Sequence, residues 1–240
     1  MSTEQNQQSE QTVQRPKLKW LPLEANPEVW NKVFHENGIS NEWAFNDVYG
    51  FDPELLGFVP RPVAAMIFLY PITEAAEQFR HEEEAALVKK EQDISPDVMF
   101  FKQTISNACG MMALIHALAN NKELVGSGLF HDIIEKAKNM TPDERAELLE
   151  SNEKLASVHK DAGDEGQTRP PPLEERIDLH FICFVEVDGH LYELDGRKSF
   201  PINHGRCTDL VECSAKVMRK FIERDPGHEN YSAIALSKLG

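Results

Sequence analysis

The chain has 240 residues and 41% hydrophobic content, enough to bury a full core in one domain or in two small ones. It has 25 basic and 40 acidic side chains and a formal net charge of −15, so we expect no binding to nucleic acid or membranes and an attraction for basic partners. Acidic surfaces are also common among ordinary cytosolic proteins, so charge alone leaves both interpretations open. No stretch approaches the ~18 apolar residues of a membrane-spanning helix.

The cysteines argue against two kinds of site. The chain has four, Cys109, Cys183, Cys207 and Cys213, and none of them forms a Cys-x-x-Cys pair. This spacing predicts neither a zinc site nor a disulfide framework, and we expect no metal ion or organic cofactor. Few cysteines and no signal peptide indicate a reducing compartment, so we expect a cytoplasmic protein.

Proline, glycine and apolar runs divide the first half of the chain into elements. Residues 1–16 are rich in Gln, Ser and Glu, which indicates a disordered tail, and residues 17–240 are expected to form a single domain. Asn26-Pro27 has the pattern of a helix start, and Gly38 has that of its end. The other expected elements are a helical turn at 52–56, a central strand at 63–70, a charged helix at 73–91 and a short strand at 98–102.

The second half alternates helices and strands. Residues 111–120 are apolar nearly all round, so we expect a buried helix there. Thr141 begins a capping-box sequence that predicts a helix to about Leu155, and residues 161–172 predict a long loop. Further helices are expected at 130–138 and 209–224, and strands at 178–187, 190–194, 200–202 and 232–236. These elements predict an α+β fold, a largely antiparallel central sheet with helices on both faces.

Asp188-Gly189 between two strand-like runs predicts a β-hairpin with a two-residue turn. In that register Val187 faces His190, and Asp195 lies diagonally across from His180 on the same face, within reach of a side-chain hydrogen bond. Glu193 shares this face but lies nearer the turn, which makes it a weaker partner. Cys183 lies on the opposite face with other apolar residues, and we expect it to be structural.

Cys109 is the candidate nucleophile. It directly precedes the predicted helix at 111–120, where the helix dipole favours thiolate over thiol. His180 would act as the general base, and Asp195 would orient its imidazole. The backbone N–H of Cys109 and the side-chain amide of Gln103 are candidate donors to an oxyanion. Each of these residues alone also has an ordinary structural interpretation.

Longer stretches resemble one known family. Residues 103–110 with 114–121 are similar to the nucleophile box of the ubiquitin carboxyl-terminal hydrolases, and residues 178–182 with 187–197 are similar to their histidine–aspartate box. Residues 20–27, 47–50 and 52–56 resemble the N-terminal segment of that family. The resemblance covers about residues 20–236 and is greatest to the small, single-domain cytosolic members.

The resemblance implies a thiol peptidase with a papain-like site in a threaded fold, in which a sheet is sandwiched between helices. It assigns Cys109 as nucleophile, His180 as base, Asp195 as orienting carboxylate and Gln103 as oxyanion donor. It implies a crossover loop over the site at about residues 160–173, which favours small or unfolded leaving groups on ubiquitin. The residues at positions where relatives touch ubiquitin are Pro22, Leu23, Glu24, Ala25, Asn26, Pro27, Gly163, Asp164, Glu165, Gly166, Gln167, Thr168, Arg169 and Pro170.

These expectations define a monomeric deubiquitinase with ubiquitin as its partner. Three alternatives stay open: a dual hydrolase that also processes Nedd8, a ubiquitin-binding protein with low turnover, and a thiol acyltransferase independent of ubiquitin. Two stretches depart from the family pattern. Met111 and Met112 follow the nucleophile box where relatives tend to have smaller or β-branched residues, which affects packing under the site. Residues 227–229, including His228, differ from close relatives in a region that helps grip ubiquitin.

Overall fold

The computed structural model describes residues 18–166 and 177–240. Its centre is a six-stranded sheet with the order β1-β6-β2-β3-β4-β5, in which every neighbouring pair is antiparallel. The strands are β1 (Trp43–Asp47), β2 (Val63–Pro71), β3 (Leu179–Val187), β4 (His190–Leu194), β5 (Ile202–Arg206) and β6 (Ser232–Lys238). The expected mixed fold with a largely antiparallel sheet is therefore confirmed.

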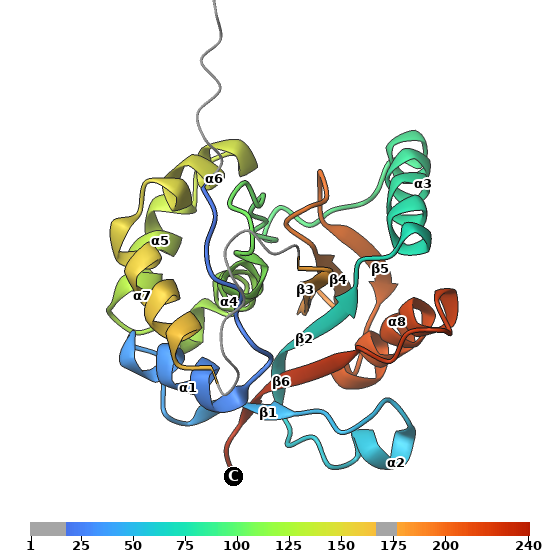
Figure 1. The fold of residues 1–240 in the computed structure, drawn as a ribbon, viewed down its shortest axis with the longest axis horizontal. Helices are drawn as coiled ribbons and strands as arrows, with labels where there is room; N and C mark the ends of the chain where they lie inside the picture. The colour runs from blue at the N-terminus through green and yellow to red at the C-terminus, as the bar shows by residue number, and fades with distance from the viewer. Residues whose placement is uncertain (1–17, 167–176) are drawn as a thin grey trace, which may run out of the picture.

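Helices cover both faces of the sheet (Figure 1). Their bounds are α1 (Pro27–Glu36), α2 (Pro53–Leu56), α3 (Glu74–Lys90), α4 (Cys109–Ala119), α5 (Leu129–Ala137), α6 (Pro142–Glu150), α7 (Glu153–Asp164) and α8 (Leu210–Arg224), with a 3₁₀ turn at Lys122–Leu124. Helix α4 is buried along its length and packs in the larger core with α1 and α5, against one face of β3. Helix α8 and α2 pack in a second core on the other face.

Successive side chains of β3 pack alternately into these two cores. Phe181, Cys183 and Val185 belong to the larger core, whereas Ile182 and Phe184 belong to the second. Because both faces of the sheet are covered, its central strands are apolar on both sides, as the run of residues in β2 predicted.

The predicted hairpin and its register are confirmed. Val187 pairs with His190 and Cys183 with Leu194 across β3 and β4. Asp188 and Gly189 have φ angles of 52° and 74°, the left-handed conformation that a type I′ turn requires at both central positions. The hairpin therefore fixes which residues of β3 and β4 share a face.

Two predicted elements differ from the structure. Residues 98–102 form no strand, because side chains rather than a neighbouring strand satisfy their backbone: Asn120 binds Met99, and His116 binds Phe101. The helix expected from Thr141 to about Leu155 is two helices, because Asn152 caps a new one through the N–H of Leu155.

Other boundaries shift. Residues 161–164 belong to α7 rather than to the expected loop, and β5 begins at Ile202 instead of residue 200. Strand β1 was not expected; it pairs with β6 at the edge of the sheet. The tail expected at 1–16 and the loop residues Gln167, Thr168, Arg169 and Pro170 lie outside the described residues.

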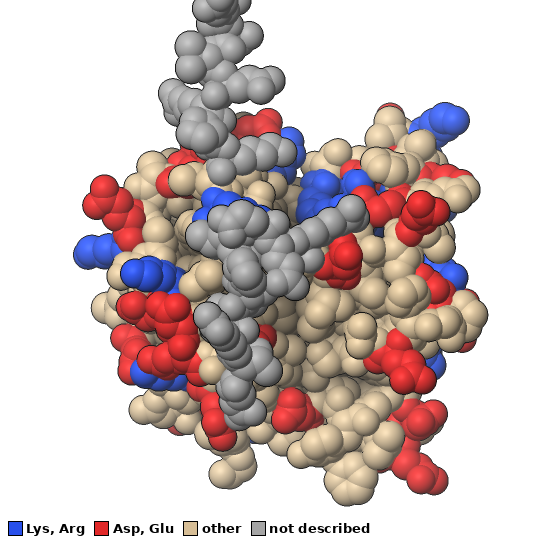
Figure 2. All heavy atoms as spheres, viewed as in Figure 1, with Lys and Arg blue, Asp and Glu red and all other residues tan. Residues whose placement is uncertain are grey.

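Acidic side chains are spread over the helices on both sides of the view in Figure 2, in keeping with the net charge of −15. In the part of the chain that the structure describes, no helix is long and apolar enough to cross a membrane.

Candidate active site

Cys109 lies at a helix N-terminus, as the sequence predicted, and is itself the first residue of α4, which begins two residues before the expected start at 111. The turn before it contains Asn107 with φ of 61°, a left-handed conformation that Asn tolerates better than most residues. The Asn107 side chain donates a hydrogen bond to the Trp20 carbonyl, and the N–H of Trp20 donates to the carbonyl of Ser106. The N-terminal segment therefore holds the turn that presents the nucleophile.

The surroundings of Cys109 favour its thiolate. Burial raises the pKa of the Cys109 thiol, but the hydrogen bond to His180 and the positive imidazolium lower it. Backbone N–H groups of Phe181 and Gly110 at the sulfur act in the same direction, and the net result is a pKa below the ordinary value. The charge of His180 and these hydrogen bonds therefore outweigh burial and favour the nucleophilic thiolate.

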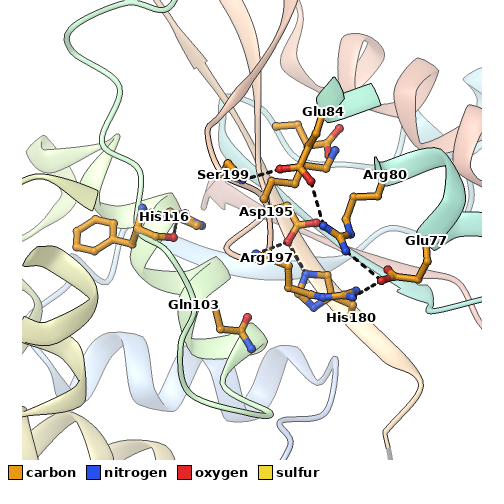
Figure 3. Close-up of polar contacts among 12 residues, drawn as sticks. Glu77, Arg80, Glu84, Gln103, His116, His180, Asp195, Arg197 and Ser199 are labelled. Carbon is orange, nitrogen blue, oxygen red and sulfur yellow. Dashed lines mark hydrogen bonds and ion pairs between the residues drawn. The ribbon is translucent and has the colours of Figure 1, made fainter. Parts of the chain in front are cut away.

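His180 and Asp195 meet in the buried interior. The distance between His180 Nε2 and Asp195 Oδ1 is 2.6 Å, and the exposed fractions of the two residues are 2% and 0%. His180 is near the start of β3, and Asp195 directly follows β4, so the hairpin register places one diagonally across from the other (Figure 3). The N–H of Arg197 also donates to Oδ1 of Asp195 at 2.9 Å.

The charges of this pair stabilise each other. Burial lowers the pKa of His180, but the charge of Asp195 and hydrogen bonds with Asp195 and Cys109 raise it to about 9. Burial raises the pKa of Asp195, and the charge of His180 and its hydrogen bond outweigh this and hold the pKa far below the usual range. The imidazole is therefore protonated at neutral pH while Asp195 is ionised.

Gln103 lies against Gly196, the residue that follows Asp195. Its N–H donates to the carbonyl of Gly196 at 2.7 Å, and a Cβ placed on Gly196 would lie 2.8 Å from Cβ of Gln103. Its Nε2 donates one hydrogen to the Ile105 carbonyl at 3.0 Å. Since an amide nitrogen carries two hydrogens, the second is available to an oxyanion.

The two stretches expected to bind substrate lie beside one another, and the first lies beside Gly110, the residue after Cys109. A Cβ on Gly110 would lie 3.0 Å from Leu23 Cβ, and one on Gly166 would lie 2.9 Å from the Glu24 carboxyl carbon. The first stretch is partly buried, and it leads into α1 through the Asn26 cap at Pro27. The structure thus brings residues 22–27 and 163–166 together.

Cys183 and Glu193, which we did not expect to act in the site, have other surroundings. Cys183 is fully buried, and burial raises the pKa of its thiol well above the ordinary value. Glu193 contacts Lys198 and His204 instead of His180. Among the described residues, no three His, Cys, Asp or Glu side chains cluster as metal ligands would.

Sequence reasoning missed the supports of the site. Glu77 of α3 accepts hydrogen bonds from Arg80 and Arg197, and Arg197 directly follows the Asp195-Gly196 turn (Figure 3). His116 and His159 are buried and bind the backbone of Phe101 and Leu21. No local pattern marks Arg197, His116 and His159 as supports, because their partners lie 15 to 138 residues away.

The fold and the geometry define a class of protein, a hydrolase or acyltransferase with a Cys–His–Asp site at the N-terminus of a buried helix. The sequence model of "Ubiquitin carboxyl-terminal hydrolase, family 1" matches residues 20–223. Ubiquitin carboxyl-terminal hydrolase isozyme L1 of Homo sapiens is 43% identical over 226 residues, which are 92% of this chain and 99% of that protein. The isozyme of Monodelphis domestica is 44% identical over 227 residues, with the same two shares.

A solved structure has the same fold. The catalytic domain of Trichinella spiralis UCH37, bound to ubiquitin vinyl methyl ester, matches with a TM-score of 0.72 at 23% identity, over 92% of this chain and 96% of that one. The chain belongs to the ubiquitin carboxyl-terminal hydrolase family 1. It is a thiol-dependent hydrolase of the ubiquitin pathway.

Proposed function

We propose that Cys109, His180, Asp195 and Gln103 hydrolyse ester, thioester, amide or peptide bonds at the C-terminal glycine of ubiquitin. The observation that carries this proposal is the buried His180–Asp195 contact of 2.6 Å together with the lowered pKa of the neighbouring Cys109 thiol. The Trichinella spiralis protein is bound to ubiquitin vinyl methyl ester, which supports ubiquitin as the partner of this chain.

The chemistry proceeds in two half-reactions. The Cys109 thiolate attacks the glycine carbonyl, and the oxyanion accepts hydrogen bonds from the Cys109 N–H and from Nε2 of Gln103. As the first residue of α4, Cys109 has no acceptor for its N–H within the helix. His180 then protonates the leaving group, leaving a thioester. Water, deprotonated by His180, hydrolyses the thioester and restores the thiolate.

We attribute ubiquitin binding to the two stretches that meet near the site. Residues 22–27 and 163–166 contribute the carboxylates Glu24, Asp164 and Glu165, and the C-terminal tail of ubiquitin is basic, so the charges are complementary. Glu165 forms an ion pair with Lys32 of α1, which links the end of α7 to the N-terminal part of the site. We expect small or unfolded leaving groups to be preferred, in a monomeric, cytoplasmic enzyme.

The first test is reaction with ubiquitin that carries a thiol-reactive electrophile at its C-terminus, followed by intact mass. Wild type should gain one ubiquitin, and Cys109→Ala should gain none while still binding ubiquitin. Cys213→Ala is the matched control, because Cys213 is also a partly buried free thiol on a helix, and it should react like wild type. Loss of ubiquitin binding in Cys109→Ala would show that Cys109 is structural.

Three alternatives predict different results. A dual enzyme would also form an adduct with the matching Nedd8 reagent. A binding protein with low turnover would bind ubiquitin tightly and show negligible steady-state hydrolysis. Another thiol acyltransferase would show no dependence on ubiquitin at all.

A further inference from the structure

Helix α3 is attached to the site in an unusual way. None of its residues is buried, so little apolar packing holds it on the sheet. Its acidic side chains instead contact the chain that follows Asp195. Glu77 contacts Arg197 at 2.7 Å, and Glu84 accepts the N–H of Ser199 at 2.8 Å (Figure 3). Between them, Glu83 contacts Lys198 at 2.7 Å. The helix and the residues after Asp195 are thus joined mainly by charge.

Lys198 is the most buried member of this set. Its exposed fraction is 4%, and its Nζ lies 2.6 Å from Glu193 Oε1 of β4 and 2.7 Å from Glu83 Oε2 of α3. The second oxygen of Glu193 contacts His204 Nε2 of β5 at 2.8 Å. Arg224 of α8 also interacts electrostatically with Glu83 and Glu193.

A buried ion pair adds little net stability, because removing the charges from water costs about as much as their attraction gains. Its geometry is nevertheless exacting, since an unpaired buried charge is strongly unfavourable. A buried lysine between two carboxylates is therefore suited to fixing the position of the backbone that carries it.

The backbone next to Lys198 includes Asp195 and binds Gln103. The N–H of Lys198 donates to the carbonyl of Asp195 at 2.9 Å, which closes the turn from Asp195 to Lys198. Within this turn the Gly196 carbonyl accepts the N–H of Gln103 at 2.7 Å. The position of Lys198 is thus coupled to both the orienting carboxylate and the oxyanion donor.

We propose that Lys198, clamped between Glu83 and Glu193, is a positioning residue that holds the Asp195–Lys198 turn so that Asp195 meets His180. This inference rests on the proposed function of Cys109, His180 and Asp195. Helix α3 then contributes to catalysis without touching substrate. Loosening the clamp lowers kcat and leaves KM nearly unchanged, because the turn orients reacting groups and does not bind ubiquitin.

The decisive variant is Glu83→Gln. Its direct effect on charge and its effect on the position of the turn shift the pH dependence of Cys109 alkylation in opposite directions. Removing a negative charge stabilises a nearby thiolate directly, which moves the acidic limb of Cys109 alkylation to lower pH. Releasing the turn instead weakens the hold of Asp195 on the imidazolium that stabilises the thiolate, which moves the limb to higher pH. The side chain of Glu83 is partly exposed, so the substitution leaves no cavity in the core.

The experiment measures alkylation of the Cys109 peptide by iodoacetamide against pH, and kcat and KM with a ubiquitin C-terminal aminocoumarin amide. Glu82→Gln is the matched control, because this substitution removes the same charge from α3. Glu82 is exposed and accepts a hydrogen bond from Gln78 of its own helix. We expect Glu83→Gln to move the limb upward by about half a pH unit and to lower kcat about three- to tenfold, and Glu82→Gln to match wild type.

A limb that stays in place or moves downward in Glu83→Gln overturns the proposal, as does a change of KM with kcat intact. Lys198→Met gives a second test: adding Glu83→Gln to it should lower kcat no further, whereas multiplying effects would show that the two residues act separately. Failure of wild type to hydrolyse the ubiquitin amide would refute the proposed function and leave the alkylation result to judge the clamp.

Discussion

Asp195→Asn removes one charge from the site and changes its shape very little. The contact with His180 is 2.6 Å long and buried, so the carboxylate is the main stabiliser of the imidazolium. The rise of the His180 pKa from 6.5 to about 9 corresponds to roughly 3 kcal/mol, or about 300-fold in the protonation equilibrium. With the charge removed, burial lowers the pKa of His180, and the interaction with Cys109 still opposes it.

An asparagine reverses the hydrogen bond if its amide nitrogen replaces Oδ1, which also accepts the N–H of Arg197. Its amide nitrogen offers a proton to Nε2 of His180, which favours the wrong tautomer. We therefore expect kcat for a ubiquitin amide to fall by about 300-fold from the electrostatic loss, and towards 10⁴-fold if the tautomer changes as well.

The assay pairs steady-state hydrolysis with an NMR titration of the His180 ring. Asp143→Asn is the matched control, because the Asp143 side chain is exposed and contacts only Lys102 among the ion pairs of the described residues. Turnover within tenfold of wild type, or an imidazole pKa that remains near 9, would refute the electrostatic role of Asp195.

His180 also makes stability depend on pH. Its pKa is higher in the folded protein than in the unfolded chain, so its contribution is complete below pH 6.5 and is lost as pH rises through about 9. The remaining predictions concern other parts of the structure.

Burial lowers the pKa of His159 to about 4, so the unfolded chain binds more protons than the folded protein at acidic pH. The free energy of unfolding should therefore fall as pH decreases from 6.5 towards 4. Equal urea midpoints at pH 7 and pH 5 would contradict this. A Cβ on Gly196 would lie 2.8 Å from Cβ of Gln103, so Gly196→Ala should displace Gln103 and lower kcat, whereas Gly227→Ala, where a Cβ meets nothing within 4 Å, should not. Thr141→Ala removes half of the capping box of α6 and should cost about 1 kcal/mol in thermal unfolding without changing kcat; a loss of activity at unchanged stability would be inconsistent with a purely structural cap.

Short-range patterns predicted much of the fold. The Asp188-Gly189 turn fixes the β3–β4 register, and that register alone places His180 near Asp195. Helix α4 and the position of Cys109 at its start follow from local sequence in the same way. These predictions succeed because the information lies within a few residues of each element.

The errors have a long-range origin. Residues 98–102 have strand-like composition, but Arg145 and His116 bind their backbone in place of a neighbouring strand. The clamp at Lys198 joins residues 115 positions apart through Glu83, and nothing near either residue signals the other. The resemblance to a family indicated the proposed catalytic residues, whereas it carried no information on these supports.

The attachment of the N-terminal segment to the nucleophile turn has a consequence for how the enzyme matures. Trp20 pairs with Ser106, and the carbonyl of Leu21 contacts His159, which follows it by 138 residues. During synthesis, Trp20 can meet its partners once residue 107 has been made, whereas Leu21 waits for His159 of α7. His180 and Asp195 follow later still, so the Cys109 thiol acquires the partners that lower its pKa only after most of the chain has been made.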